Sequence, residues 1–271
     1  HVLAAKGLYV RVTSTCGFHR APVAKGALAG HIQNKTSNRE LHNKAEYSPS
    51  VYFMQDLIPF LGMAVIAIAI LISITTHEFS HGLAAFLLGD NTAKDQWRLT
   101  LNPLAHIDPF GTILLPAVLM LLGAPVIGWA KPVPFNPYNL SDQRYGSLKV
   151  GIAGPLSNFL IFLVAGVLLK VLLPSFSPEN MLITFLQQLV LINFVLMMFN
   201  LIPIPPLDGS KVLFGLLPPR FEYIERNLEQ YGFFILMFVM FIEYTGFPVI
   251  RYAIGTSFYF ITHLLGIPIE L

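Results

Sequence analysis

The stretch at 57–89 carries only three ionisable side chains, His77, Glu78 and His81. As a helix it would be about 50 Å long, which exceeds the roughly 30 Å hydrocarbon layer of a membrane. The three polar residues lie roughly 18 Å from its C-terminal end, and therefore inside the bilayer and nearer one face. Ionisable side chains are costly at that depth unless they have partners, so they mark a functional site.

Further apolar segments indicate a membrane protein. Of the 271 residues, 54% are hydrophobic and 12% are charged, whereas a soluble domain has about 25% charged residues. We therefore predict an all-α polytopic membrane protein with about five to six transmembrane helices in the lipid bilayer. The net charge of +2 indicates no nucleic-acid partner. The later apolar segments lie at 111–130, 150–173, 181–202, 231–241 and 249–267.

The three ionisable residues form an HExxH motif within HEFSH at 77–81. On a helix, positions i and i+4 share one face, so both imidazoles can bind one metal ion while Glu78 points at a water molecule. Zinc lowers the pKa of such a water and a carboxylate can take its proton, which is the chemistry of peptide hydrolysis. Chance gives this motif in roughly 1% of chains of this length. A chance occurrence within an apolar helix is rarer still, because ionisable residues are costly there.

A catalytic zinc site needs a third protein ligand and an open position. Asp208 is the best candidate, because it follows an apolar segment and three prolines within NLIPIPPLDG at 200–209. Prolines interrupt helical hydrogen bonding, and extended backbone at membrane depth is tolerated where it lines a polar cavity. Two alternatives stay open: an ordinary proline-rich turn, and a separate ligand pair at His106 and Asp108.

Asn158 is a polar residue early in the apolar segment at 150–173. An amide in such a helix commonly forms a hydrogen bond to a neighbouring helix. It can equally support the metal site, and both interpretations stay open.

Three motifs follow in order on successive apolar segments: HEFSH at 77–81, GPLSN at 154–158 and NLIPIPPLDG at 200–209. In this combination the chain resembles the site-2 protease family of intramembrane zinc metalloproteases. The stretches RLTLNPLAHIDPFGT and GWAKPVPFNP are similar to the compact bacterial type without a PDZ domain. That similarity implies a multi-pass protein of the bacterial inner (cell) membrane.

The resemblance also implies roles for single residues. One zinc ion per chain would be bound by His77, His81 and Asp208. Glu78 would be the catalytic base, and Asn200 would help to hold an extended substrate.

We therefore expect a zinc-dependent intramembrane endopeptidase that hydrolyses peptide bonds in or near transmembrane segments of single-span membrane proteins. The main alternative is a membrane metal-binding or transport protein without proteolytic turnover. A transporter would show further ionisable residues along a path through several helices. A membrane-anchored zinc protease that cuts soluble loops is a third possibility. The sequence indicates no oligomeric state.

The segment at 111–130 differs from the others because glycines and prolines interrupt it. Such residues break helices, so we expect a re-entrant or short β element between the first two core helices, with 98–101 as the candidate strand. A re-entrant segment would bring Asp208 to the side nearer His81. Lys and Arg in the short loops would then place this side toward the cytoplasm.

The chain divides into two parts. Residues 1–55 form a basic tract, with seven Lys or Arg against two Glu up to position 50. This composition predicts a flexible tail that an anionic membrane surface can attract. Residues 56–271 form the metalloprotease domain. Cys16 is the one cysteine of the chain, so a metal must be bound by His and carboxylate ligands.

Overall fold

The computed structural model describes residues 49–123 and 128–269, and the regular structure within these ranges is entirely helical. The prediction of an all-α fold is thereby confirmed. The predicted basic tract at 1–55 lies outside the described residues up to position 48. The elements are α2 (Pro49–Leu87), α3 (Thr92–Asp95), η1 (Pro103–His106), η2 (Pro109–Leu114), α4 (Leu115–Leu121), η3 (Pro137–Asn139), α5 (Gly146–Leu172), α6 (Met181–Asn200), α7 (Asp208–Leu216), η4 (Pro219–Phe221), α8 (Glu222–Tyr244) and α9 (Val249–Leu265).

Among the described helices, three are long and apolar enough to cross a membrane: Phe60–Leu87 within α2, then α5 and α6. The pair Tyr223–Tyr244 and Val249–Leu265, bent by 78°, would add a fourth if it crosses as one broken span. The chain is therefore a multi-pass membrane protein, but the count of five to six helices is not confirmed. Fewer candidate spans are found because the described part of the segment at 111–130 contains only a short helix, and because a sharp bend separates the last two apolar helices.

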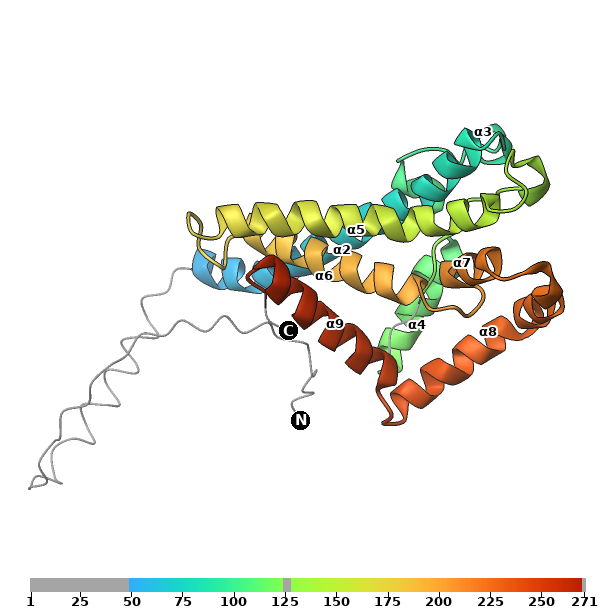
Figure 1. Ribbon diagram of the computed structural model, residues 1–271. Coiled ribbons are helices and arrows are strands. Elements are labelled where there is room, and N and C mark those ends of the chain that lie inside the picture. The colour runs from blue at the N-terminus through green and yellow to red at the C-terminus, as the bar shows by residue number, and fades with distance from the viewer. Residues whose placement is uncertain (1–48, 124–127, 270–271) are drawn as a thin grey trace, which may run out of the picture.

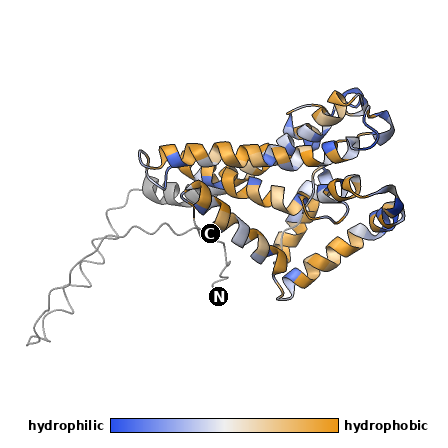
Figure 2. Ribbon diagram, viewed as in Figure 1, coloured by the Kyte–Doolittle hydropathy of each residue, from blue (hydrophilic) through white to orange (hydrophobic). Residues whose placement is uncertain are grey.

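α2, α5 and α6 pack side by side at the centre of the fold (Figure 1). Figure 2 shows that these helices are apolar along most of their length, and large apolar side chains such as Leu160 and Val164 are exposed on α5, as expected where outer faces meet lipid. Phe162 and Phe194 join α5 to α6 with ring centroids 5.3 Å apart, and Phe258 of α9 lies 5.1 Å from Phe194. All three rings are buried, and burial of one such side chain contributes about 1.5–3 kcal/mol.

The segment predicted to be re-entrant begins with η2 and α4. These two elements form one apolar helix, Pro109–Leu121, which at about 20 Å is too short to cross the hydrocarbon layer. Both ends of the segment lie together, because Trp129 N–H donates to Gly111 O over 3.1 Å and the Thr112 hydroxyl donates to Trp129 O over 2.8 Å. This geometry supports a re-entrant course, which stays a prediction. The alternative strand at 98–101 is wrong, since Leu99 and Thr100 form a bend and none of these residues is part of a strand.

The loop that follows α2 and the loop that precedes α5 are joined at the buried carboxylate of Asp90. Its Oδ1 accepts from the hydroxyl and N–H of Thr92 and from the amide of Asn139, and its Oδ2 accepts from Asn136 N–H. Burial by itself raises the pKa of the Asp90 carboxyl, but these hydrogen bonds hold that pKa below its usual value. Asp90 thereby anchors the segment at 131–140 beside the end of α2.

Candidate metal centre

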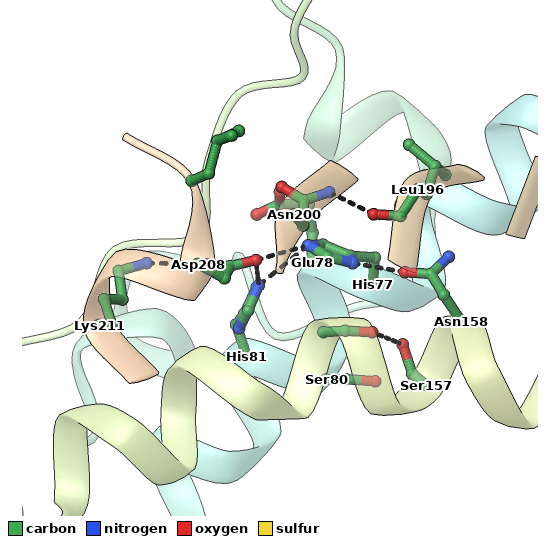
Figure 3. Close-up of polar contacts among 12 residues, drawn as sticks. His77, Glu78, Ser80, His81, Ser157, Asn158, Leu196, Asn200, Asp208 and Lys211 are labelled. Carbon is green, nitrogen blue, oxygen red and sulfur yellow. Dashed lines mark hydrogen bonds and ion pairs between the residues drawn. The ribbon is translucent and has the colours of Figure 1, made fainter. Parts of the chain in front are cut away.

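His77 and His81 lie one turn apart on α2 and turn the same face toward Asp208, the first residue of α7 (Figure 3). Both His Nε2 atoms lie 3.0 Å from Asp208 Oδ2 and 3.1 Å from each other. All three residues are buried, and within the described part of the chain they form the one group of three or more candidate metal ligands. The structure therefore joins residues that are 127 or more positions apart in the sequence.

The spacing of these three atoms fits a zinc ion. Bonds of about 2.0–2.2 Å in a tetrahedral site place neighbouring ligand atoms about 3.3–3.6 Å apart, close to the 3.0–3.1 Å observed. His81 Nδ1 lies 2.7 Å from the backbone oxygen of Val150, which can only accept a hydrogen bond. In neutral His81 the proton therefore sits on Nδ1, and Nε2 offers a lone pair to a metal. Three protein ligands leave a fourth position open, as catalytic zinc sites require.

Gly154 of α5 lies directly against the two imidazoles. A Cβ at this position would overlap the rings of His77 and His81. The glycine in GPLSN is thus required by the close approach of α5 to α2, which keeps both rings in place.

The carboxylate of Asp208 has two sets of partners. Oδ2 faces the histidines, while Oδ1 accepts from Lys211 Nζ over 3.1 Å, one turn further along α7. Burial by itself raises the pKa of Asp208, but the close approach of the His77 and His81 rings and the charge of Lys211 hold that pKa well below its usual value. The ionised form is the one that binds a metal.

Glu78 lies next to the ligand group but contacts a different part of the chain. Its Oε2 accepts from Val133 N–H over 2.8 Å. Val133 stands between Pro132 and Pro134, and prolines have no N–H, so it supplies the one backbone donor of this short stretch. The loop that Asp90 anchors thereby orients the Glu78 carboxylate.

The remaining predicted residues divide into two groups. Asn158 lies on the site, with Oδ1 2.5 Å from His77 Nδ1. Asn200 is half-buried at the end of α6 and donates to Leu196 O over 3.0 Å, so its role in substrate binding stays a prediction. The alternative pair of ligands lies outside the ligand group: His106 Nε2 contacts Thr100 O, and Asp108 caps η2.

The backbone around the three prolines also differs from expectation. Residues 201–207 form turns and bends, with Ile204 N–H donating to Ile202 O and Leu207 N–H donating to Ile204 O. The prediction of extended backbone around the three prolines is therefore wrong, because these turns and bends satisfy the N–H groups locally.

Sequence reasoning missed Lys211 and Val133. Lys211 follows Asp208 by three positions, a spacing that brings two side chains together on a helix, so this contact was predictable. The contact of Val133 with Glu78 spans 55 positions and leaves no local signal.

Comparison with known proteins supports the same assignment. The family described as "Peptidase family M50" matches residues 170–242, which include Asp208. "Putative zinc metalloprotease YwhC" of Bacillus subtilis is 38% identical over 197 residues, covering 70% of this chain and 84% of that protein. Rip2 of Mycolicibacterium smegmatis, which bears the same description, is 32% identical over 189 residues, covering 68% and 69% of the two chains. No solved structure matches significantly.

A bundle of membrane helices with a buried His–His–Asp group defines a multi-pass membrane metalloprotein. The chain belongs to peptidase family M50, the site-2 protease family of zinc metalloproteases.

Proposed function

We propose that this protein is a zinc endopeptidase that cleaves peptide bonds in or near the transmembrane segments of single-span membrane proteins. The observation that carries the proposal is the convergence of His77, His81 and Asp208 within 3.1 Å. The two histidines lie within the candidate membrane span Phe60–Leu87, so a substrate must reach them from within or beside the bilayer.

His77, His81 and Asp208 would hold the zinc ion, one per chain. When bound, zinc supplies Lewis-acid polarisation of the scissile carbonyl and of a water molecule. Glu78 accepts a proton from the attacking water, whose oxygen bonds to the carbonyl carbon. The carbon–nitrogen bond then breaks, and Glu78 returns the proton to the leaving amine. Val133 holds one carboxylate oxygen of Glu78 during these transfers.

The substrate must unwind before it is cut. A transmembrane helix hides each amide in an i to i−4 hydrogen bond, so the bond to be cleaved is accessible only in extended backbone. We assign Asn200 to holding that backbone through its side-chain amide. The bacterial relatives favour the bacterial cell membrane as the location.

The alternative is a membrane metal-binding or transport protein. Transport requires ionisable groups along a path through several helices. In the described residues the candidate ligands form a single group, and Glu78 beside them suits hydrolysis.

Co-expression tests the proposal. A panel of single-span membrane proteins, tagged at both ends, is expressed with the wild type or with Glu78→Gln, and new termini are mapped by mass spectrometry. We expect a product only with the wild type, cut within or next to the hydrophobic segment. Cuts confined to soluble loops would support a membrane-anchored protease instead. A zinc-loaded wild type that cuts no member of the panel would favour the metal-binding alternative.

A further inference from the structure

Three buried polar side chains form a chain of hydrogen bonds that ends at His77. They are Ser73 of α2, Asn193 of α6 and Asn158 of α5, and none is exposed. These hydrogen bonds therefore join all three central helices. A buried polar group is costly unless it is fully hydrogen-bonded, so this arrangement calls for an explanation beyond packing.

The donors and acceptors along this series of hydrogen bonds can be assigned from its first member, Ser73. Ser73 Oγ donates to Ala69 O over 2.7 Å, and a backbone carbonyl can only accept. Asn193 Nδ2 lies 2.8 Å from both Leu189 O and Ser73 Oγ. The amide nitrogen of Asn193 must occupy this position because both neighbours accept, so its Oδ1 faces Asn158.

The same reasoning determines the orientation of Asn158. Its Nδ2 donates to Asn193 Oδ1 over 2.8 Å, which turns its Oδ1 toward His77 Nδ1, 2.5 Å away. An amide oxygen cannot donate, so His77 Nδ1 must carry the proton. His77 Nε2 then offers its lone pair on the side of Asp208.

A reversed Asn158 amide would have the opposite effect. Its Nδ2 would face His77 Nδ1, which would then have to accept, and the proton would move to Nε2 in the neutral ring. That is the atom that lies 3.0 Å from Asp208 Oδ2. An interhelical hydrogen bond alone would tolerate either orientation of the amide, whereas a metal ligand tolerates one.

We propose that Asn193 and Ser73 are positioning residues, which act through Asn158 to hold His77 in the tautomer and ring orientation that bind the metal. His81 needs no such chain, because it contacts the Val150 carbonyl directly. The inference rests on the proposed zinc site and deepens it by naming residues remote from the metal.

The test compares zinc affinity in purified, detergent-solubilised protein, measured by competition with a chelator. Mutation of a residue that orients a metal ligand typically lowers metal affinity about 10–100-fold. We expect Asn158→Ala to lower zinc affinity by a factor within that range, and Asn193→Ala to lower it on the order of tenfold. The d–d absorption bands of the Co²⁺-substituted Asn193→Ala protein should also shift, because Asn158 Nδ2 then keeps only its 3.4 Å contact with Ser73 O and orients His77 less firmly. Ser73→Ala should have a smaller effect, since Leu189 still anchors Asn193.

A double-mutant cycle separates positioning from packing. If Asn193 acts through Asn158, the double variant Asn158→Ala/Asn193→Ala should bind zinc within about twofold of Asn158→Ala alone. Val190→Ala is the matched control, because Val190 is equally buried on α6 and takes no part in the series of hydrogen bonds. It should lower the thermal unfolding temperature and leave zinc affinity and cobalt bands unchanged.

Two results would overturn the inference: an Asn193→Ala protein with the zinc affinity and cobalt spectrum of the wild type, or losses that add in the double variant. Both differ from failure of the proposed function, in which the wild type itself would bind no zinc.

Discussion

The backbone N–H of Val133 donates a 2.8 Å hydrogen bond to Oε2 of Glu78. This contact joins the loop before α5 to the helix that carries both histidines. Asp90 holds the same loop through Asn136 and Asn139. The position of the proposed base therefore depends on two loops as well as on α2.

Glu78→Gln should separate metal binding from catalysis. The glutamine oxygen can still accept from Val133 N–H, so the loop and the zinc ligands should keep their places. Loss of the base should lower proteolysis by about 10²–10⁴-fold, while elemental analysis should find zinc near one per chain. His77→Ala should lose both zinc and activity. A Glu78→Gln enzyme that cleaves at the wild-type rate would disprove the proposed mechanism.

Asp208→Ala should lower both zinc content and cleavage, because two histidines cannot complete a catalytic site. Asp208→Glu has one more methylene group, so it should retain part of the metal in a displaced position and lose most activity. Asp95→Ala is the matched control, since Asp95 is an exposed carboxylate outside the ligand group. Full zinc occupancy and activity in Asp208→Ala would show that the third ligand lies elsewhere.

Cysteine labelling should show whether the segment at 111–130 is re-entrant. In a Cys16→Ser background, Leu104→Cys and Tyr138→Cys occupy exposed positions on either side of this segment. Both should react with an impermeant thiol reagent from the same side of the membrane. Glu179→Cys, in the loop between α5 and α6, should react from the opposite side. Labelling of positions 104 and 138 from opposite sides would mean that the segment spans the membrane.

Asp90→Ala should destabilise the fold by about 1–3 kcal/mol, because buried donors lose their acceptor. The folded-state pKa of Asp90 is lowered, so its stabilising contribution is present above the unfolded value of about 3.9. The contribution is lost as pH falls through the lower folded-state value. Thermal unfolding of the wild type and Asp90→Ala should therefore differ most near neutral pH and converge in acid. A difference that grows in acid would contradict this role.

Much of the site was predictable because its signals are local. The four-residue spacing of His77 and His81 places both on one helix face, whatever the helix packs against. Apolar runs longer than the bilayer indicate membrane helices by length and composition alone. Asp208 was predictable as the third ligand because it is a carboxylate that follows an apolar segment and three prolines. The prediction of extended backbone before it was wrong.

Tertiary structure decided which distant groups meet. Val133 reaches Glu78, and Asn193 reaches Asn158, only because α2, α5 and α6 pack in one particular rotation about their axes. Apolar residues cover these helices on most sides, so periodicity in the sequence does not tell which face turns inward. The sequence therefore specified the chemistry available at each position, and the packing of the helices decided which of those groups form the site.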